Sequence, residues 1–481
     1  MRSITVVASL VVSLVGGVVP AFGEEQAPGS IRFEAAPGTV LRVEGHGRYS
    51  DTIAAVPAPQ SGVQVINELS LDAYVEGLGE MPAHWPEEAL KTQAVAARTY
   101  AWWEAVQGIW RDKGLDFDIC ATTACQVFHG REIIETPKVG RRWKAAVDAT
   151  AGEVLMDGEW PILARFFSSS GGETRPNEHV FPEDGHRPYL RTVDDPEDRE
   201  SSPLAHWRVV FTRDQMNQIF AHGQRLSTVA PFADIERVLS DGTRSDQIRV
   251  TGVNGDVVEL VSWEFRQFVS AVAPQLFPGS FPQKRDDGGA MPATFPTSRM
   301  DFTVEDDRVV VDGYGWGHAV GMSQYGAKGK AEKGWTYDDI LANYYGDIRP
   351  KVVDHSPERV RVGLSWDRGS FTVHADGPVT ILRAGREATV DGGTWTVTAR
   401  EDGSLALSGQ DVAWKDRTTV SRRSPAPTPP ASPPASQAGA QTERTERPDA
   451  VNAIGRVTNT VVTALEHASP VIVLMRLAFG R

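Results

Sequence analysis

The sequence predicts an α+β protein: a mixed, strand-rich domain with a packed alanine-rich helix and an inserted α/β subdomain, followed by a small all-β module and a disordered linker. Three observations predict this fold class. Residues 30–75 alternate apolar and polar residues in short runs such as "TVLRVEG", which is typical of half-buried strands. Residues 86–106 form an alanine-rich run with no breaker before Gly108, which indicates a helix. Residues 357–418 alternate regularly in apolar and polar residues and are punctuated by turns with Gly and Asp, which indicates further strands.

The N-terminal residues 1–23 predict a secretory signal peptide. Arg2 precedes an apolar run that ends at Val19, and the small residues Ala21 and Gly23 stand where an exported precursor is cleaved. An uncleaved N-terminal anchor is the alternative, because the run is near the length of a membrane span, although Ser and Gly weaken it. We therefore expect the protein to be secreted or held in the cell envelope, outside the cytoplasm.

The alanine-rich run has the features of a helix that packs closely. Pro86 suits the first turn, and the acidic side chains of Glu87 and Glu88 complement the N-terminal dipole. A second helix is expected over "GRRWKAAVDAT", and the "DG" in "GEVLMDGEWPIL" predicts a hairpin after it. The close-packing face of the first helix should carry Ala94, Ala97 and Ala101.

Residues 204–275 predict a subdomain inserted into the main domain. They begin with the strand-like "WRVVF", and Thr212 with Gln215 three residues later forms a capping-box pattern that starts a helix. A hairpin region with "DG" at 241 and "NG" at 254 follows. An ordinary part of one α+β core is the alternative for this segment. Residues 276–300, rich in Pro and polar residues, predict a long surface loop.

The C-terminal part divides into three predicted segments. Residues 357–420 are expected to form the small β module, and residues 422–449 a Pro/Ala/Ser-rich linker that cannot bury a core. Residues 450–481 carry apolar residues at helical spacing but are too short, and broken by Pro470, to span a membrane. This amphipathic segment would either dock on a protein partner or the membrane surface, or form a frayed tail.

Charge and cysteines exclude some functions. A net charge of −14 at pH 7 argues against nucleic-acid binding, because neutralising phosphates requires a basic surface. Cys120 and Cys125 lie close together, and an exported chain meets an oxidising compartment, so we predict a short-range disulfide. The alternative is a metal site using both thiolates and His129, for which tetrahedral zinc needs a fourth ligand that the sequence does not place. We predict no metal and no cofactor.

Two patches carry polar residues that packing alone does not explain. In "GLGEMPAHWPEEALK", the carboxylate of Glu80 lies between glycines and a Met-Pro-Ala-His-Trp-Pro run. In "RFFSSSGGET", residues 165–174, the G-x-S-x-G turn of a serine hydrolase and the lysine of a phosphate-binding loop are both missing. The second patch therefore offers a hydroxyl-rich backbone edge, which would lie along a polar ligand or form only a turn.

A third patch is "GYGWGHAVGMSQYGA", residues 313–327, whose glycines permit close backbone approach. His318 and Gln324 add polar groups to a stretch rich in Gly, Trp and Tyr. Aromatic rings and amides suit sugars, whose apolar faces stack while their hydroxyls form hydrogen bonds. Taken alone, the patch is better explained as a glycine-rich loop whose histidine is satisfied in the core.

Together the patches resemble one family. The blocks "LSLDAYVEGLGEMPAHWPEEALKTQAVAARTYA", "RFFSSSGGETRPNEHVF" with "PYLRTVDDPED", and "GYGWGHAVGMSQYGAKGKAEKGWTYDDILANYY" are similar, in order, to those of the stage II sporulation protein D (SpoIID) and amidase enhancer (LytB) family. The resemblance implies a peptidoglycan-active domain over residues 28–350. The turn before Glu80 is shorter than in sporulation-type members. Ala319 stands where the family usually has Gly, which matters little if the backbone there has a negative φ.

The resemblance implies a lytic transglycosylase of bacterial peptidoglycan. In such members the acid of the Glu-Met-Pro motif is catalytic, a role that falls here on Glu80. A glycosidase usually needs two carboxylates, but the 6-hydroxyl of muramic acid can attack its own anomeric carbon, so one Glu suffices. The alternative is a non-catalytic, wall-binding amidase enhancer. Expected partners are glycan strands and a cell-wall amidase. Predicted substrate-binding residues are Arg98, Ser168, Ser169, Gly171, Gly172, His318 and Gln324.

Overall fold

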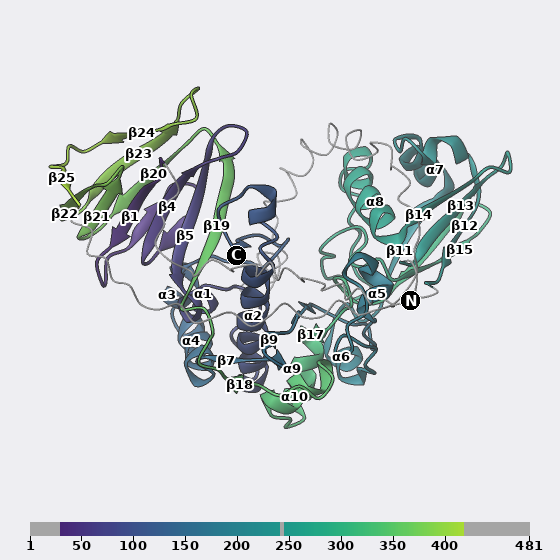
Figure 1. The fold of residues 1–481 in the computed structure, drawn as a ribbon. Helices are drawn as coiled ribbons and strands as arrows, with labels where there is room; N and C mark the ends of the chain where they lie inside the picture. The colour runs from purple at the N-terminus through teal and green to yellow at the C-terminus, as the bar shows by residue number, and fades with distance from the viewer. Residues whose placement is uncertain (1–28, 241–244, 418–481) are drawn as a thin grey trace, which may run out of the picture.

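The computed structural model describes residues 29–240 and 245–417, which fold as a mixed α+β protein. Figure 1 shows a helical base that carries two arms, a β unit on one side and a strand-rich subdomain on the other. The predicted α+β class is confirmed. The predicted signal peptide, linker and C-terminal helix lie outside the described residues. Within the described ranges, no helix is long and apolar enough to cross a membrane.

The β unit combines strands from both ends of the described chain. Its larger sheet has eight strands in the order β25-β22-β21-β1-β4-β5-β19-β6, and its smaller sheet has five in the order β24-β23-β20-β2-β3. The strands are β1 (Ile31–Ala35), β2 (Leu41–Val43), β3 (Gly47–Tyr49), β4 (Thr52–Pro57), β5 (Val63–Ser70), β6 (Ile119–Cys120), β19 (Arg359–Arg368), β20 (Ser370–Ala375), β21 (Val379–Arg383), β22 (Arg386–Val390), β23 (Gly393–Ala399), β24 (Leu405–Gly409) and β25 (Lys415–Asp416).

This pairing differs from the prediction that residues 357–420 form a module of their own. Strand β1 lies between β21 and β4, with Phe33 opposite Ile381 on one side and Ile53 on the other, and β5 pairs with β19. The first and last described strands therefore share one sheet. The prediction of a separate module is wrong because alternation reports which face of a strand is buried, and does not identify the strand beside it.

The base is built around α2 (Glu87–Gln107), which confirms the predicted alanine-rich helix. It ends at Gly108, whose φ is 64°, and Ala94, Ala97 and Ala101 are fully buried. Helices α4, α9 and α10 pack against it. The other helices of the base are α1 (Leu71–Glu76), α3 (Arg131–Glu135), α4 (Val139–Ala149), α5 (Asn177–Val180), α6 (Pro196–Ser201), α9 (Gln324–Glu332) and α10 (Tyr337–Tyr344), with short 3₁₀ turns η1 (Arg111–Lys113) and η2 (Pro182–Asp184).

Short strand pairs connect the helices of the base. The predicted second helix is confirmed as α4, and the predicted "DG" hairpin is confirmed as β8 with β9. A parallel pair joins β10 to β17, so the serine-glycine patch and the third patch lie side by side. These strands are β7 (Glu153–Val154), β8 (Met156–Asp157), β9 (Trp160–Pro161), β10 (Phe166–Phe167), β17 (Met322–Ser323) and β18 (Lys351–Val352).

The subdomain has a hydrophobic core of its own, whose members lie between Leu204 and Trp316 in the sequence. The capping box of Thr212 and Gln215 is present at the start of α7. The subdomain is longer than the predicted residues 204–275, because β16 returns beside β11 and closes its sheet. Its elements are β11 (Trp207–Thr212), α7 (Arg213–Ala221), η3 (Leu226–Val229), β12 (Phe232–Val238), β13 (Gln247–Gly252), β14 (Val257–Val261), α8 (Ser262–Leu276), β15 (Met300–Val304) and β16 (Arg308–Gly313).

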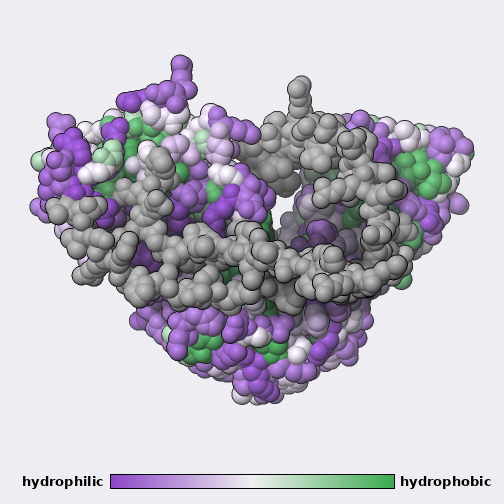
Figure 2. Space-filling view, in the orientation of Figure 1, coloured by the Kyte–Doolittle hydropathy of each residue, from purple (hydrophilic) through white to green (hydrophobic). Residues whose placement is uncertain are grey.

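The two cores explain how the arms are arranged. One core cluster contains residues of both the β unit and the base, whereas the subdomain core is separate. The space-filling view shows a mostly hydrophilic face and an opening between the arms above the base (Figure 2). Helix α8 lies on the side of the subdomain that faces this opening (Figure 1). The opening thus lies between the subdomain and the β unit, and the β unit shares its core with the base.

Candidate active site

Two glycines before Glu80 let a second segment approach the turn that carries it. A Cβ atom on Gly77 would lie 2.4 Å from the ring of Phe128. The N–H of Gly79 donates to the carbonyl of Val127 at 2.9 Å. A side chain on either glycine would push this segment away, so the glycines are required by the close approach rather than by an unusual φ.

The carboxyl group of Glu80 is held by the approaching segment. Its Oε1 accepts the backbone N–H of Val127 at 2.6 Å. Met81 and Trp85, both 5% exposed, add apolar surroundings, and the Trp85 ring lies 4.9 Å from that of Tyr325. Burial raises the pKa of Glu80 to about 7, although the bond from Val127 acts in the opposite direction. Such a group can both donate and accept a proton near neutral pH.

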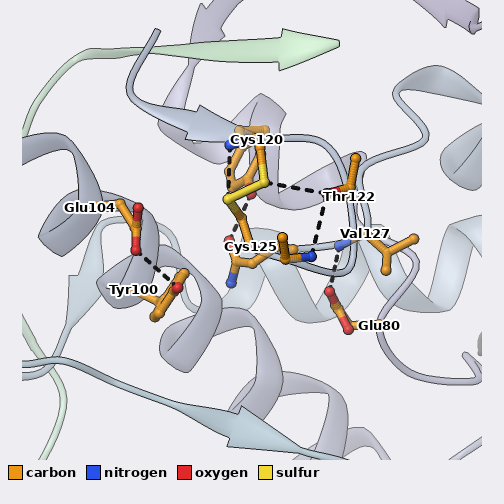
Figure 3. The surroundings of a disulfide bond; sticks show 10 residues. Glu80, Tyr100, Glu104, Cys120, Thr122, Cys125 and Val127 are labelled. Atoms are coloured by element: carbon orange, nitrogen blue, oxygen red, sulfur yellow. Dashed lines mark hydrogen bonds between the residues drawn. A yellow bond between two sulfur atoms is a disulfide. The ribbon is translucent and has the colours of Figure 1, made fainter. Parts of the chain in front are cut away.

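A disulfide fixes the segment that holds Glu80. Cys120 and Cys125 are bonded to each other, and the N–H of Cys120 also donates to the Cys125 sulfur at 3.1 Å. Val127 follows two residues later, and Figure 3 shows its N–H directed at Glu80 beside the disulfide. The predicted disulfide is present, and no cluster of metal-ligating side chains occurs within residues 29–240 and 245–417. The two sulfur atoms are therefore bonded to each other and do not form the alternative metal site.

Buried amide side chains surround the Glu80 turn. Gln324, at the start of α9, donates its amide to the Glu80 carbonyl at 3.0 Å and to Gln93 Oε1 at 3.2 Å. The amide nitrogen of Gln93 has no hydrogen-bond partner, although this side chain is fully buried. Gln126 accepts the hydroxyl of Tyr74 at 2.7 Å. Gln93 was not among the predicted site residues, and its one signal in the sequence was an amide on an otherwise alanine-rich helix face.

The serine-glycine patch is anchored by two buried aspartates. Asp198 accepts the Ser169 hydroxyl at 2.8 Å and the Gly171 N–H at 2.9 Å. Asp195 accepts the Ser170 hydroxyl at 2.9 Å. The hydroxyls of Ser169 and Ser170 therefore point into the protein. Sequence reasoning missed both aspartates as anchors, although they lie in the "VDDPED" stretch that contributed to the resemblance.

The rest of the serine-glycine patch forms backbone contacts with the third patch. Ser168 is partly exposed, and its carbonyl accepts the N–H of Tyr325 at 3.0 Å. Gly171 and Gly172 have φ values of 67° and 101°, and a Cβ on Gly171 would lie 2.7 Å from the backbone nitrogen of Gly315. The edge is thus used for close packing, and Ser168 is the member that accepts a hydrogen bond from the Tyr325 backbone.

The His318 ring lies between two aromatic rings. Its ring centre is 5.3 Å from that of Phe167 and 5.6 Å from that of Phe181. Burial, with smaller contributions from nearby arginines, lowers the pKa of His318 to about 3, so the ring is neutral at pH 7. The next residue, Ala319, has a φ of 66°. The expectation that alanine in place of the family's usual glycine matters little required a negative φ. Because φ is positive, the alanine strains the backbone here.

Arg98 is packed inside the base. It is 1% exposed, and its guanidinium pairs with Asp72 at 2.7 Å and donates to the Glu153 carbonyl at 3.1 Å. Arg98 thus links α2 to α1 and β7. Of the predicted substrate-binding residues, the structure brings Gln324 to the Glu80 turn, while Arg98 and His318 lie in other surroundings.

Comparison with known proteins identifies the chain. The family model described as "SpoIID: Stage II sporulation protein" matches residues 59–156, which contain Glu80, α2 and the disulfide. An uncharacterized protein of Brachyspira hyodysenteriae is 30% identical over 68% of this chain and 77% of its own length. The chain belongs to the stage II sporulation protein D family. The stage II sporulation protein D of Bacillus subtilis is 27% identical over 68% of this chain and 88% of its own length.

One of the relatives carries a different name. The amidase enhancer of Bacillus subtilis is 28% identical over 55% of this chain, but the match covers only 38% of the enhancer. The SpoIID family is therefore shared by proteins named for sporulation and for amidase enhancement. Because the family model ends at residue 156, the serine-glycine and His318 patches lie beyond it, within the longer pairwise matches.

Proposed function

We propose that the protein is a cell-envelope lytic transglycosylase that cleaves the bond between N-acetylmuramic acid and N-acetylglucosamine. The observation that carries the proposal is Glu80, a partly buried carboxyl whose pKa is raised to about 7 in a turn held by the Val127 N–H. A carboxyl with that pKa is substantially protonated at neutral pH, as a general acid must be. The relatives named stage II sporulation protein D and amidase enhancer support action on the cell wall.

The proposed reaction uses one carboxyl group twice. Protonated Glu80 donates its proton to the glycosidic oxygen as the bond from that oxygen to the muramic acid C1 breaks. The resulting carboxylate then takes the proton of the muramic acid 6-hydroxyl as O6 bonds to C1. The products are a 1,6-anhydro-muramic acid end and a free 4-hydroxyl on N-acetylglucosamine, and no water is consumed. Glu80 ends protonated, ready for another cycle.

The test is product analysis with purified glycan strands. Replacing Glu80 by Gln should lower the release of anhydro-muropeptides by at least about 10²-fold, which is the lower end of general acid catalysis. A matched control is Glu87→Gln, which removes an exposed carboxyl from the start of α2, where Glu87 pairs with Lys91 at 2.8 Å. Anhydro products at the wild-type rate from folded Glu80→Gln protein would contradict the proposal.

The second candidate function is amidase enhancement without cleavage, which the similarity to an amidase enhancer favours. In that case a cell-wall amidase would be the partner. The two functions separate in one experiment with a purified amidase: an enhancer increases release of stem peptides equally well with Glu80→Gln protein. A transglycosylase instead forms anhydro ends without amidase and loses them on that substitution.

A further inference from the structure

The residues on either side of Val127 contact one buried tyrosine. Val127 donates its N–H to the Glu80 carboxyl at 2.6 Å (Figure 3). The residue before it, Gln126, accepts the hydroxyl of Tyr74 at 2.7 Å. The residue after it, Phe128, stacks on the Tyr74 ring, with the ring centres 5.2 Å apart. Tyr74 therefore holds the segment on both sides of the residue that contacts Glu80.

The hydrogen bond between Tyr74 and Gln126 has a fixed direction. Both side chains are fully buried. Burial, with smaller contributions from nearby acidic groups, raises the pKa of Tyr74 well above its usual range, so the hydroxyl keeps its proton. Gln126 accepts from that hydroxyl through its side-chain oxygen and donates its amide to the Ala97 carbonyl of α2 at 3.3 Å. Because both ends of the amide are engaged, Gln126 ties the segment to α1 and α2.

Two other contacts constrain the segment without setting the direction of this N–H. The disulfide joins Cys125, two residues before Val127, to Cys120. The carbonyl of Val127 accepts the N–H of Gly79 at 2.9 Å. The N–H of Val127 belongs to the planar peptide unit that begins at the carbonyl of Gln126. The orientation of Gln126 therefore decides where this N–H points.

We propose that Gln126, held by Tyr74, is a positioning residue that directs the Val127 N–H at the Glu80 carboxyl. The inference rests on the proposed function, because Glu80 is the group that protonates the glycosidic oxygen. An N–H bonded to a carboxyl group favours its charged form. The bond from Val127 thus limits the increase that burial causes in the pKa of Glu80, which lies at about 7. If the N–H turned away, the pKa of Glu80 would rise further.

Neighbouring charges do not account for the titration of Glu80, whose pKa is set by burial and by the Val127 bond. Tyr74 on α1 stays protonated. The ring of His129 packs on the turn, since a Cβ atom on Gly79 would lie 2.7 Å from it, and burial lowers the pKa of His129, so it is neutral at pH 7. Glu104 on α2 raises the pKa of Tyr74 but does not shift that of Glu80. The amide side chains of α2 and α9 around the turn carry no charge.

The test removes the tyrosine hydroxyl and keeps the ring. Tyr74→Phe retains the stacking on Phe128 but leaves Gln126 without its donor. Glu80 acts as an acid, so activity is lost as pH rises through its pKa. We expect the alkaline limb of the pH profile of kcat/KM for anhydro-product release to move up by about half a pH unit or more. We also expect kcat to fall about tenfold, with KM nearly unchanged.

A second variant separates positioning from folding. Tyr74→Phe combined with Gln126→Met removes both polar partners from the core, so it should be more stable than Tyr74→Phe alone and should keep the shifted limb. The control is Tyr345→Phe, which removes another fully buried hydroxyl, one that donates to the Arg165 carbonyl at 2.8 Å. The control should lose stability without moving the alkaline limb.

Two results would overturn the proposal: an alkaline limb at the wild-type pH in folded Tyr74→Phe protein, or an equal shift in Tyr345→Phe. The same pKa can be measured without catalysis, from the stability that Glu80→Gln adds at each pH. In a Tyr74→Phe background this gain should keep growing to a higher pH than in the wild type, and an unchanged profile would contradict the inference. If the wild type forms no anhydro ends, the proposed function fails, and the stability measurement still decides whether Tyr74 and Gln126 position the bond to Glu80.

Discussion

Replacing Glu80 by Gln removes a group whose charged form is disfavoured in the folded state. Burial raises the pKa of Glu80 from 4.5 to about 7, and the bond from Val127 offsets this only in part. Each pKa unit corresponds to about 1.36 kcal/mol, so ionisation of Glu80 costs the folded state about 3 kcal/mol relative to the unfolded chain. Gln has nearly the same shape and no charge, so the variant avoids this cost.

The effect has a definite dependence on pH. Well below pH 4.5 the carboxyl is protonated in both states, and the substitution should change the free energy of unfolding very little. Between pH 4.5 and about 7 the folded state keeps a proton that the unfolded state releases, so wild-type stability falls as pH rises. The advantage of Glu80→Gln should therefore grow from near zero at about pH 4 to about 3 kcal/mol at about pH 8.

Urea unfolding followed by tryptophan fluorescence at several pH values measures this difference. The control is Glu87→Gln, because pairing with Lys91 lowers the pKa of Glu87, and its removal should slightly reduce stability at pH 8. A stability difference for Glu80→Gln that does not change with pH, or a loss at pH 8, would refute the reasoning that Glu80 is held in a desolvated position.

Three further predictions concern the surroundings of the site. Ala319→Gly should raise stability by about 1 kcal/mol, because φ is 66° there; an unchanged or lower melting temperature would count against it. Replacing Cys120 and Cys125 by Ser should lower the free energy of unfolding by about 2 kcal/mol. It should also reduce release of anhydro products, because the hydrogen bond to Glu80 comes from the segment that the disulfide fixes. Wild-type turnover would disprove that link. Asp198→Asn should lower the free energy of unfolding, measured by chemical denaturation, by about 2–3 kcal/mol, because an amide cannot accept hydrogen bonds from every donor around Asp198. A smaller loss would mean that another group accepts these hydrogen bonds.

Features determined by neighbouring residues were predictable from the sequence. The helix after Pro86, the capping box at Thr212 and the disulfide each depend on a few adjacent positions, and each occurs in the structure. The sheet partners of residues 357–420 could not be predicted in this way. The register of β19 with β5 joins residues nearly 300 positions apart, such as Val360 and Leu69, and alternation is compatible with many such registers.

The site shows the same division between local and distant determinants. The spacing of glycines and prolines around Glu80 indicated a constrained turn. The Val127 segment, which packs against this turn, lies 47 residues further along the chain. No sequence pattern could locate it. Ser169 was predicted to face a ligand because a serine edge is polar. Its hydroxyl instead meets Asp198, a buried partner that hydrophobic periodicity does not reveal, since it reports apolar faces only.

Asp195 and Asp198, which anchor the serine-glycine patch, also hold together segments that lie far apart in the sequence. Ser323 donates to Asp198 at 2.6 Å, and Lys330 donates to Asp195 at 2.7 Å, with both partners of the Lys330 pair buried. The aspartates precede the subdomain in the chain, whereas Ser323 and Lys330 follow it, so these bonds tie both ends of the insertion to the base. A buried, hydrogen-bonded ion pair is costly to break on one side. Gln324 is the next residue after Ser323 and reaches the Glu80 carbonyl. The bonds that close the insertion therefore also set the position of Gln324, and through it support the turn that presents the carboxyl group.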